Sequence, residues 1–314
     1  MGNISKKARH LLHTAFFLQL GFLFATAPRI PGRRQKVWEP FVGKNFAHRG
    51  LHDNSWGIPE NSMMAFKRAV DRNYGIELDV HLTADQQLVV HHDESLYRMC
   101  HIDRKIERTT LKELRTYHLL NTEETIPTLD EVLQMVNGQV PLLIELKCET
   151  AKYKELCRKV YEALAAYQGP FLIESFNPLV LRWFRKHHPD ILRGQLSCNF
   201  FKEKPHCDLV LFLITSLCSN FLCRPDFISY KYTDIGSLNV RIACGLFRSK
   251  LAVWTIKSRD AYEKMRSRAQ MFIFEGFLPD APHASVRPPK SARKLGEHLL
   301  FNENYDASTL HADA

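Results

Sequence analysis

The sequence lacks the patterns that mark several common protein classes. Its eight cysteines include no C-x-x-C, and the closest pair, Cys218 and Cys223, does not have the spacing of a zinc site. No helix-turn-helix, zinc-finger or aromatic-basic ribbon pattern is present, so the positive charge alone is a weak argument for nucleic acid. There is also no internal repeat of solenoid length. These absences argue against a zinc module, a nucleic-acid-binding protein and a repeat protein.

The sequence has only a weak candidate for a membrane-spanning segment. Residues 11–27 are largely apolar but include Gln19, and basic residues lie on both sides of them. The Ala-Thr-Ala at residues 25–27 resembles a signal-peptide cleavage site, but Pro28 directly after it argues against cleavage. We therefore predict a helix that lies in, or shallowly crosses, the inner membrane surface, with Arg and Lys on lipid phosphates. The alternative is a helix that packs on the folded domain.

The composition is that of a globular protein with a basic surface. Hydrophobic residues make up 45% and charged residues 25% of the 314 residues, and the formal net charge is +9. This charge favours phosphate esters, an anionic membrane surface or nucleic acid as partners, although a solvated basic surface explains it equally well. Several cysteines lie inside apolar runs and are predicted to be reduced, which favours a cytoplasmic protein.

From residue 45 onward, short apolar runs alternate with amphipathic segments. Strands are predicted at residues 45–48, 75–82, 87–91, 141–147, 171–175, 191–196, 226–230, 251–255 and 271–275. Helices are predicted at residues 61–72, 110–117, 128–136, 150–167, 178–187, 207–221, 235–247 and 259–267. One strand per unit gives eight units, which predicts a (β/α)8 TIM barrel over residues 43–281. Residues 1–42 form an N-terminal segment and residues 282–314 a loosely ordered tail.

Acidic side chains gather where the predicted strands end, and a barrel places its active site there. Glu77 and Asp79 are two apart on one strand and therefore point to the same face, and Glu145 and Lys147 repeat this arrangement on the next barrel strand. Three converging carboxylates repel one another unless a cation lies between them. Oxygen ligands favour Mg²⁺, Ca²⁺ or Mn²⁺ over Zn²⁺, and such an ion suits polarisation of a phosphoryl oxygen.

Four further residues fit the cleavage of a phosphodiester. His48 and His92 can act as an acid–base pair near neutral pH, one activating a nucleophile and one protonating the leaving alkoxide. Arg49 and Lys147 can neutralise the non-bridging oxygens of the phosphate.

Supporting roles are expected for a few neighbours of these residues. Glu60 can orient Arg49 or a ligand, and Trp254 ends a later strand. Asn61 is expected to cap the first helix. His81 shares a strand face with the acidic residues and either lines the site or packs below it. Each residue alone has a plainer explanation, as a solvated side chain or an ordinary ion pair, so the prediction depends on their joint position at strand ends.

Several segments resemble the glycerophosphodiester phosphodiesterase family. They are Phe46-Ala47-His48-Arg49-Gly50, Pro59-Glu60-Asn61-Ser62, Glu77-Leu78-Asp79-Val80, Val89-Val90-His91-His92-Asp93, Glu145-Leu146-Lys147 and Ser175-Phe176. The resemblance implies a (β/α)8 barrel and hydrolysis of glycerophosphodiesters to glycerol 3-phosphate and an alcohol, with one divalent cation, Mg²⁺ or Ca²⁺. It implies the following roles: metal ligands Glu77, Asp79 and Glu145, acid–base residues His48 and His92, and phosphate-binding residues Arg49 and Lys147.

The resemblance weakens after the last strand. The Thr-Asp-x-Pro-like turn common in such families is replaced by Phe-Glu-Gly-Phe-Leu-Pro at residues 274–279. Residues 94–127 are polar and irregular, and head-group selectivity is expected there.

Two other functions compete with hydrolysis of small glycerophosphodiesters. One is a membrane-associated lysophospholipase D or phospholipase, which would need an apolar rim around the barrel mouth from the following residues: Phe176, Phe200, Phe201 and Phe277. The other is a non-catalytic barrel that binds a phosphodiester. The presence of all three carboxylates and both histidines argues against such a binding module.

Overall fold

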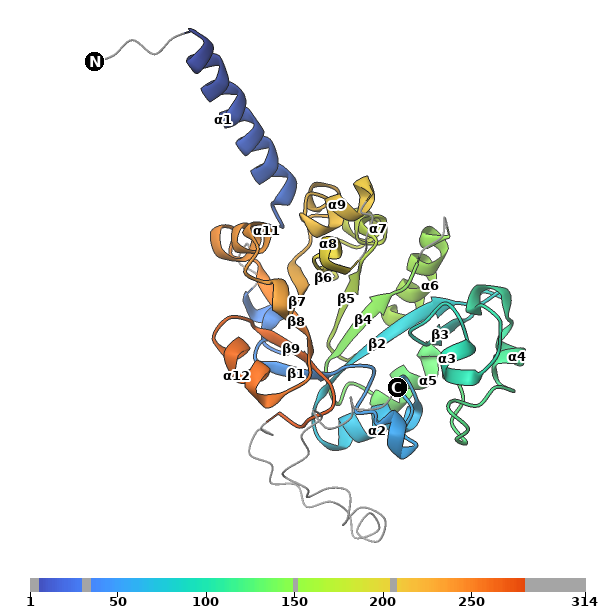
Figure 1. Ribbon diagram of the computed structural model, residues 1–314. Helices are drawn as coiled ribbons and strands as arrows, with labels where there is room; N and C mark the ends of the chain where they lie inside the picture. Colours follow the sequence, from blue (N-terminus) through green and yellow to red (C-terminus); the bar gives the residue numbers. More distant parts are fainter. Residues whose placement is uncertain (1–5, 30–34, 149–151, 204–207, 280–314) are drawn as a thin grey trace.

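The computed structural model describes residues 6–29, 35–148, 152–203 and 208–279. At its centre is a closed barrel of parallel strands (Figure 1). The barrel strands are β1 (Lys44–Ala47), β2 (Gly75–Leu82), β4 (Leu142–Leu146), β5 (Phe171–Ser175), β6 (Arg193–Ser197), β7 (Phe227–Lys231), β8 (Lys250–Ile256) and β9 (Met271–Phe274). β1 pairs with both β9 and β2, which closes the ring. The predicted (β/α)8 barrel is therefore confirmed, and β3 (Leu88–Val90) is added antiparallel to β2.

The longer helices cover the outside of this barrel (Figure 1). They are α2 (Met63–Asp71), α5 (Leu129–Val136), α6 (Tyr153–Ala165), α7 (Pro178–His187) and α12 (Arg259–Arg266). Shorter helices fill the connections: α3 (Tyr97–Cys100), α4 (Leu111–Leu114), α8 (Phe200–Glu203), α9 (Leu209–Thr215), α10 (Asn220–Cys223) and α11 (Leu238–Val240). The remaining turns are η1 (Gln35–Trp38), η2 (Asn54–Trp56), η3 (Ile106–Arg108), η4 (Tyr232–Asp234) and the π-helical η5 (Arg241–Leu246).

Two long helices predicted after β6 and β7 are wrong. Within residues 207–221 the chain forms α9 and α10 instead, and Leu217 between them has a φ of 58°, which a helix cannot accommodate. Within residues 235–247 the short α11 passes into the π-helical η5. Apolar content predicted both helices, but it did not reveal the backbone breaks within them.

Hydrogen-bonded caps fix where two of the outer helices begin. Thr128 and Glu131 form a reciprocal capping box at the start of α5, as predicted for Thr128. The predicted cap at Asn61 is wrong, because the Ser62 hydroxyl accepts the amide hydrogen of Ala65 at the start of α2. The Asn61 side chain is therefore available to the barrel interior.

Alternation along the strands separates the barrel's inside from its outside. On β2 and β4, the outward side chains Leu78 and Ile144 pack beneath the helices. On the inside, a floor of apolar side chains fills the end of the barrel from which the strands start; it consists of Trp38, Phe41, Phe46, Leu143, Leu172, Leu192, Phe227, Ala252, Met271 and Ile273. This floor leaves the opposite end of the barrel, where the strands finish, for polar side chains.

Residues 94–127 form a compact layer beside β3. Their apolar side chains build a small core of their own, with Leu96, Met99 and Ile106 fully buried in it. The segment is irregular in its backbone, as predicted, with only short helical turns, but its apolar core was not predicted. The helix predicted at residues 110–117 shortens to α4, which begins at a capping box of Thr110 and Glu113.

Helix α1 (Lys6–Thr26) extends away from the barrel (Figure 1). The exposed fraction is 72% for Leu11 and 69% for Phe17, so the helix is not packed on the folded domain along most of its length. Only its last turn is fixed: Arg224 donates to the carbonyls of Phe24 and Ala27, and its guanidinium lies over the Phe24 ring. None of the described helices combines the length and the hydropathy that crossing a bilayer requires.

Other predictions concern the cysteines and the tail. Seven cysteines lie in the described residues, and all seven are free thiols. The loose tail predicted at residues 282–314 lies outside the described residues.

Candidate active site

Strand register brings three carboxylates side by side at the mouth of the barrel. Asp79 on β2 is the partner of Glu145 on β4, and Glu145 is the partner of Glu174 on β5. Glu77 lies one inward position earlier on β2. All four side chains are buried. Glu174 was not among the site residues predicted from the sequence.

The carboxylates of Glu77, Asp79 and Glu145 form the cluster predicted from the sequence. Their ligand atoms lie within 4.8 Å of one another. Burial, together with the neighbouring carboxylates, holds the pKa of Glu77 well above its ordinary value. Burial also raises the pKa of Glu145, against the opposing charge of Lys147. The repulsion that the sequence predicted is therefore built into the site.

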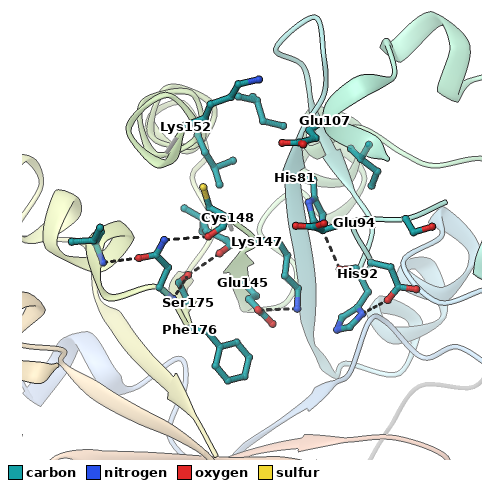
Figure 2. A pocket seen from close by; sticks show the side chains of 18 of the residues that line it. His81, His92, Glu94, Glu107, Glu145, Lys147, Cys148, Lys152, Ser175 and Phe176 are labelled. Carbon is teal, nitrogen blue, oxygen red and sulfur yellow. Dashed lines mark hydrogen bonds and ion pairs between the residues drawn. The ribbon is translucent and has the colours of Figure 1, made fainter. Parts of the chain in front are cut away.

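The Lys147 ammonium lies against this cluster. Its Nζ is 3.1 Å from Asp79 Oδ1 and 2.8 Å from Glu145 Oε1, and the second contact is drawn in Figure 2. Burial alone would raise the pKa of Asp79, but Lys147, His92 and Arg49 together hold it below its usual range. Asn61 Nδ2 donates to Asp79 Oδ2 at 2.8 Å and orients that carboxylate.

The residues present fit a hard divalent cation. Glu77, Asp79 and Glu145 supply oxygen atoms alone, the donor type that Mg²⁺ and Ca²⁺ prefer. A divalent charge between them would offset the repulsion that raises the pKa values of Glu77 and Glu145.

A tight turn after β1 carries Arg49 over the cluster. Arg49 has a φ of 52°, and Gly50 follows with a φ of 81°. A Cβ on Gly50 would lie 2.9 Å from the Ala65 carbonyl carbon, so the turn requires glycine. The Arg49 backbone N–H donates to Glu77, and its guanidinium donates to Glu60 at 2.7 Å. Its buried Nε has no hydrogen-bond partner and lies 3.7 Å from Asp79 Oδ2, which leaves a donor for a ligand.

His48 is held by a residue that sequence reasoning left without a role. Its Nδ1 is 2.7 Å from Glu275 Oε2, just after β9. Because a carboxylate accepts, Nδ1 carries the proton and Nε2 keeps a lone pair. Burial lowers the pKa of His48 to about 4 despite Glu275, so the imidazole is neutral at pH 7. The sequence contained one indication of a role for Glu275: it directly follows the last strand, where the turn common in the family is replaced.

His92 is oriented in the same way by its neighbour along the chain. Its Nδ1 is 2.6 Å from Asp93 Oδ1, and its backbone carbonyl lies 3.1 Å from Nε2 of His81 (Figure 2). His81 therefore lines the site from behind His92, one of the two positions that the sequence allowed. Burial lowers the pKa of His81 to about 4, so that it is a neutral donor at pH 7.

Arg98 on α3 links the residues that hold Arg49 to the residue that holds His92. Its Nε donates to Asp93 at 2.6 Å, and its two terminal nitrogens donate to both oxygens of Glu60 at 2.7 and 2.9 Å. Glu60 in turn holds Arg49, as the sequence predicted. A continuous chain of charge-assisted hydrogen bonds thus connects Arg49 to His92. Arg98 was missed because it lies in the segment predicted to be irregular.

The aromatic residues near the mouth divide into two groups. Phe176 packs edge-on against Trp254 at 5.9 Å and lies beside Phe200 at 5.8 Å. Trp254 therefore supports the Phe176 ring, and it is not among the residues that line the cavity next to Glu145, Lys147 and His92. Phe277 packs instead on Phe274 of the outer core, so its predicted place in an apolar rim is wrong.

Comparison with known proteins identifies the family to which the chain belongs. The Glycerophosphoryl diester phosphodiesterase family profile matches residues 48–200. A glycerophosphodiester phosphodiesterase of Caldanaerobacter subterraneus subsp. tengcongensis is 36% identical over 250 residues, which cover 76% of this chain and 95% of the relative. The chain belongs to the glycerophosphodiester phosphodiesterase family. Within that family it is also similar to human lysophospholipase D GDPD1, with 30% identity over 182 residues, 54% of this chain and 55% of the relative.

Solved structures of similar proteins have the same fold. A Thermotoga maritima glycerophosphodiester phosphodiesterase superposes with a TM-score of 0.57 and 25% identity, covering 73% of this chain and 93% of the other. An Oleispira antarctica phosphodiesterase, solved in complex with the product sn-glycerol-3-phosphate, gives a TM-score of 0.60 at 24% identity, covering 74% and 93%.

Proposed function

We propose that this barrel hydrolyses glycerophosphodiesters to glycerol 3-phosphate and an alcohol, and that the residues at its mouth carry the reaction. The observation that supports this most directly is the meeting of an all-oxygen acidic cluster with two imidazoles, each fixed through Nδ1 by a carboxylate. Two cations, Arg49 and Lys147, lie against the same cluster. Together these groups offer a cation site, an acid–base pair and positive charge for the phosphate, which are the contributions that metal-assisted phosphodiester cleavage uses.

We assign Glu77, Asp79 and Glu145 as ligands of one divalent cation, Mg²⁺ or Ca²⁺. When bound, such an ion polarises a phosphoryl oxygen and offsets the negative charge that develops on the phosphate. Arg49 offers its free Nε and Lys147 its ammonium to the non-bridging oxygens.

We assign the two histidines as the acid–base pair. With Nδ1 held by a carboxylate, each ring presents Nε2 to the site. The neutral His48 can accept the proton of the attacking hydroxyl through this nitrogen. His92 then donates a proton to the oxygen of the departing alcohol, and Asp93 stabilises its protonated form.

The experiment is an assay of the full chain for release of glycerol 3-phosphate from glycerophosphocholine and glycerophosphoethanolamine, with Mg²⁺, Ca²⁺ or EDTA. Cation-dependent release is expected, and Glu77→Gln should lower it about a hundredfold or more. Glu162→Gln, at an exposed position of α6, is the control and should leave release unchanged. Release that persists in EDTA and in Glu77→Gln would refute the assignment of the cluster.

We also propose that α1 attaches the enzyme to an anionic membrane surface, lying in it rather than spanning it. The support is the exposed apolar surface of the helix, with Leu11, Leu12, Phe16, Phe17 and Leu18 all open to solvent, combined with the net charge of +9. The full chain should float with vesicles that contain phosphatidylglycerol, and Phe17→Asp should reduce flotation. Leu238→Asp, on α11, is the matched control at an equally exposed apolar position. A protein that stays in the soluble fraction contradicts this proposal.

A further inference from the structure

A histidine beside the active site has no partner for either of its ring nitrogens. The His52 side chain is half-buried, and both Nδ1 and Nε2 are shielded from solvent without forming a hydrogen bond. An imidazole that loses its contacts with water and gains no protein partner destabilises the fold, so such groups are rare in native proteins. Two unpaired nitrogens on one ring therefore indicate that His52 serves a ligand.

The backbone on both sides of His52 is fixed. The amide hydrogen of Leu51 is donated to the carbonyl of Ala65, and the N···O distance is 2.9 Å. The amide hydrogen of Asp53 is donated to the carbonyl of Ile58, also at 2.9 Å. His52 thus projects from a defined position in the segment that follows β1.

The described residues contain a second group of three potential metal ligands, and His52 belongs to it. The ligand atoms of His48, His52 and Glu275 all lie within 4.8 Å of one another. A Zn²⁺ ion holds nitrogen and carboxylate ligands at about 2.0–2.2 Å, so two of its ligands lie at most about 4.4 Å apart. Small rotations of the three side chains therefore suffice to bind one ion. The side chains of His48 and Glu275 are 15% and 24% exposed, which gives an ion access from solvent.

The donor atoms of this group differ from those of the acidic cluster. Two imidazole nitrogens and one carboxylate suit Zn²⁺ and similar transition-metal ions, whereas the all-oxygen cluster suits Mg²⁺ or Ca²⁺. Burial lowers the pKa values of His48 and His52, so at pH 7 both rings are neutral and each has a nitrogen lone pair. Lys257 lies 3.2 Å from Glu275 Oε1, but it is 66% exposed and its flexible side chain can move away.

We propose that His48, His52 and Glu275 form a second metal site, which binds Zn²⁺ or a similar transition-metal ion, and that an ion bound there inhibits the enzyme. The binding itself does not depend on the proposed function. The inhibition does depend on it, because His48 is the base of the proposed reaction.

Inhibition follows whichever nitrogen of His48 binds the ion. If Nε2 is the ligand, its lone pair forms the bond to the metal. If Nδ1 is the ligand, the proton that Nδ1 shares with Glu275 is displaced and the neutral ring carries its proton on Nε2 instead. In both cases His48 has no lone pair left for the proton of the attacking hydroxyl. The substrate and the acidic cluster are not altered.

The binding experiment is calorimetric titration of the full chain with Zn²⁺ in excess Mg²⁺. His52→Gln should weaken one binding event about a hundredfold or more, because losing even a residue behind a metal ligand costs tenfold to a hundredfold. His187→Gln removes an exposed histidine on α7 and is the matched control. Glu77→Gln should keep the same binding event. Unchanged affinity in His52→Gln, or loss of the event in Glu77→Gln, would overturn the proposal.

A measurement on the unaltered protein does not depend on how the variants fold. Co²⁺ bound in place of Zn²⁺ should give visible d–d absorption without a charge-transfer band from thiolate to metal, since the expected ligands are nitrogen and oxygen. Zn²⁺ should then displace the Co²⁺ signal. A thiolate band would assign the ion to cysteines, and the absence of bound Co²⁺ would leave no site; either result refutes the proposal.

Inhibition is measured by release of glycerol 3-phosphate from glycerophosphocholine in excess Mg²⁺. His52→Gln should be active without Zn²⁺, and the Zn²⁺ concentration for half-inhibition should rise about a hundredfold or more relative to the unaltered enzyme and His187→Gln. Equal inhibition of all three proteins would mean that Zn²⁺ acts at the acidic cluster, which overturns the inhibitory role. If the unaltered enzyme releases nothing without Zn²⁺ but shows binding that depends on His52, the proposed function fails and the metal site stands.

Discussion

At the scale of single residues, the site depends on carboxylates that hold histidines in place. His48 and Glu275 are 227 positions apart in the chain, yet their side chains meet at 2.7 Å. Glu275 raises the pKa of His48, although burial lowers that pKa by more. Glu275 is therefore a positioning residue, which sets both the proton location and the basicity of the imidazole.

Replacing Glu275 tests this role. Glu275→Gln should lower kcat about tenfold to a hundredfold, because the amide can no longer hold the charged form or fix the tautomer. Loss of the carboxylate lowers the pKa of His48 further, so the acidic limb of kcat/KM should move to lower pH. The measurement is a pH–rate profile on glycerophosphocholine, with the exposed Glu263→Gln as control. A limb that does not move would mean that Glu275 has only a structural role.

The sequence predicted the histidines but not all of their partners. Glu77, Asp79 and Glu145 could be placed because period-two alternation fixes the face of each strand. Asp93 adjoins His92 in the chain. Glu275 reaches His48 only because the last strand pairs with the first, and alternation within one strand contains no such information.

At the scale of elements, the short helix α3 acts on the barrel mouth from outside it. The side chain of Arg98 on α3 makes this contact, because it donates hydrogen bonds to both Glu60 and Asp93. The bonds to Glu60 and Asp93 raise the pKa of Arg98, whereas the pKa of Asp93 is lowered, against the effect of burial, by His92 and Arg98 together.

Removing this contact should impair catalysis without unfolding the enzyme. Arg98→Gln should lower kcat about tenfold, because Glu60 and Asp93 lose the group that spaces Arg49 and His92. Arg98→Lys should not restore activity, since one ammonium cannot reproduce the planar fork of donors. The matched control is Arg104→Gln, which breaks an exposed pair with Glu113 in the same segment. Full activity in Arg98→Gln would show that the network is dispensable.

Helix starts were more predictable than helix lengths. Thr128 begins α5 through a local capping box that can be read from four consecutive residues. The break between α9 and α10 falls at Leu217, which has a φ of 58° and is fully buried in the core; no cap or turn residue in the local sequence marks this position. For α1, the sequence indicated an apolar helix, but its projection from the barrel is set by contacts with Arg224 and Asn220 near β7.

At the scale of the whole molecule, buried histidines make stability depend on pH. Burial lowers the pKa values of His48, His81 and His91 from 6.5 to about 4. The unfolded chain therefore takes up protons between pH 6.5 and 4 that the folded protein does not, and stability falls as the pH falls through this window. Glu174 acts in the opposite direction, because burial raises its pKa to about 8 and favours folding as the pH falls.

The contribution of one histidine to the pH dependence of stability can be measured by comparing a variant with the unaltered protein. His91 is buried and has no role in the proposed reaction. His91→Gln should make the free energy of unfolding less sensitive to acid, with the difference from the unaltered protein changing by about 3 kcal/mol between neutral pH and pH 4. Denaturant unfolding at several pH values measures it, and the exposed His187→Gln should show no such change. Parallel curves for the unaltered protein and His91→Gln would contradict the expectation.

The pairing of β1 with β9 also determines when the enzyme becomes complete during its synthesis. The ribosome makes β1 and the acidic residues of β2 and β4 early, but residues 271–275 emerge long afterwards. Until then the first strand lacks one hydrogen-bonded neighbour and His48 lacks Glu275. A nascent chain that stops before β9 would therefore carry most of the catalytic residues in an open, inactive sheet.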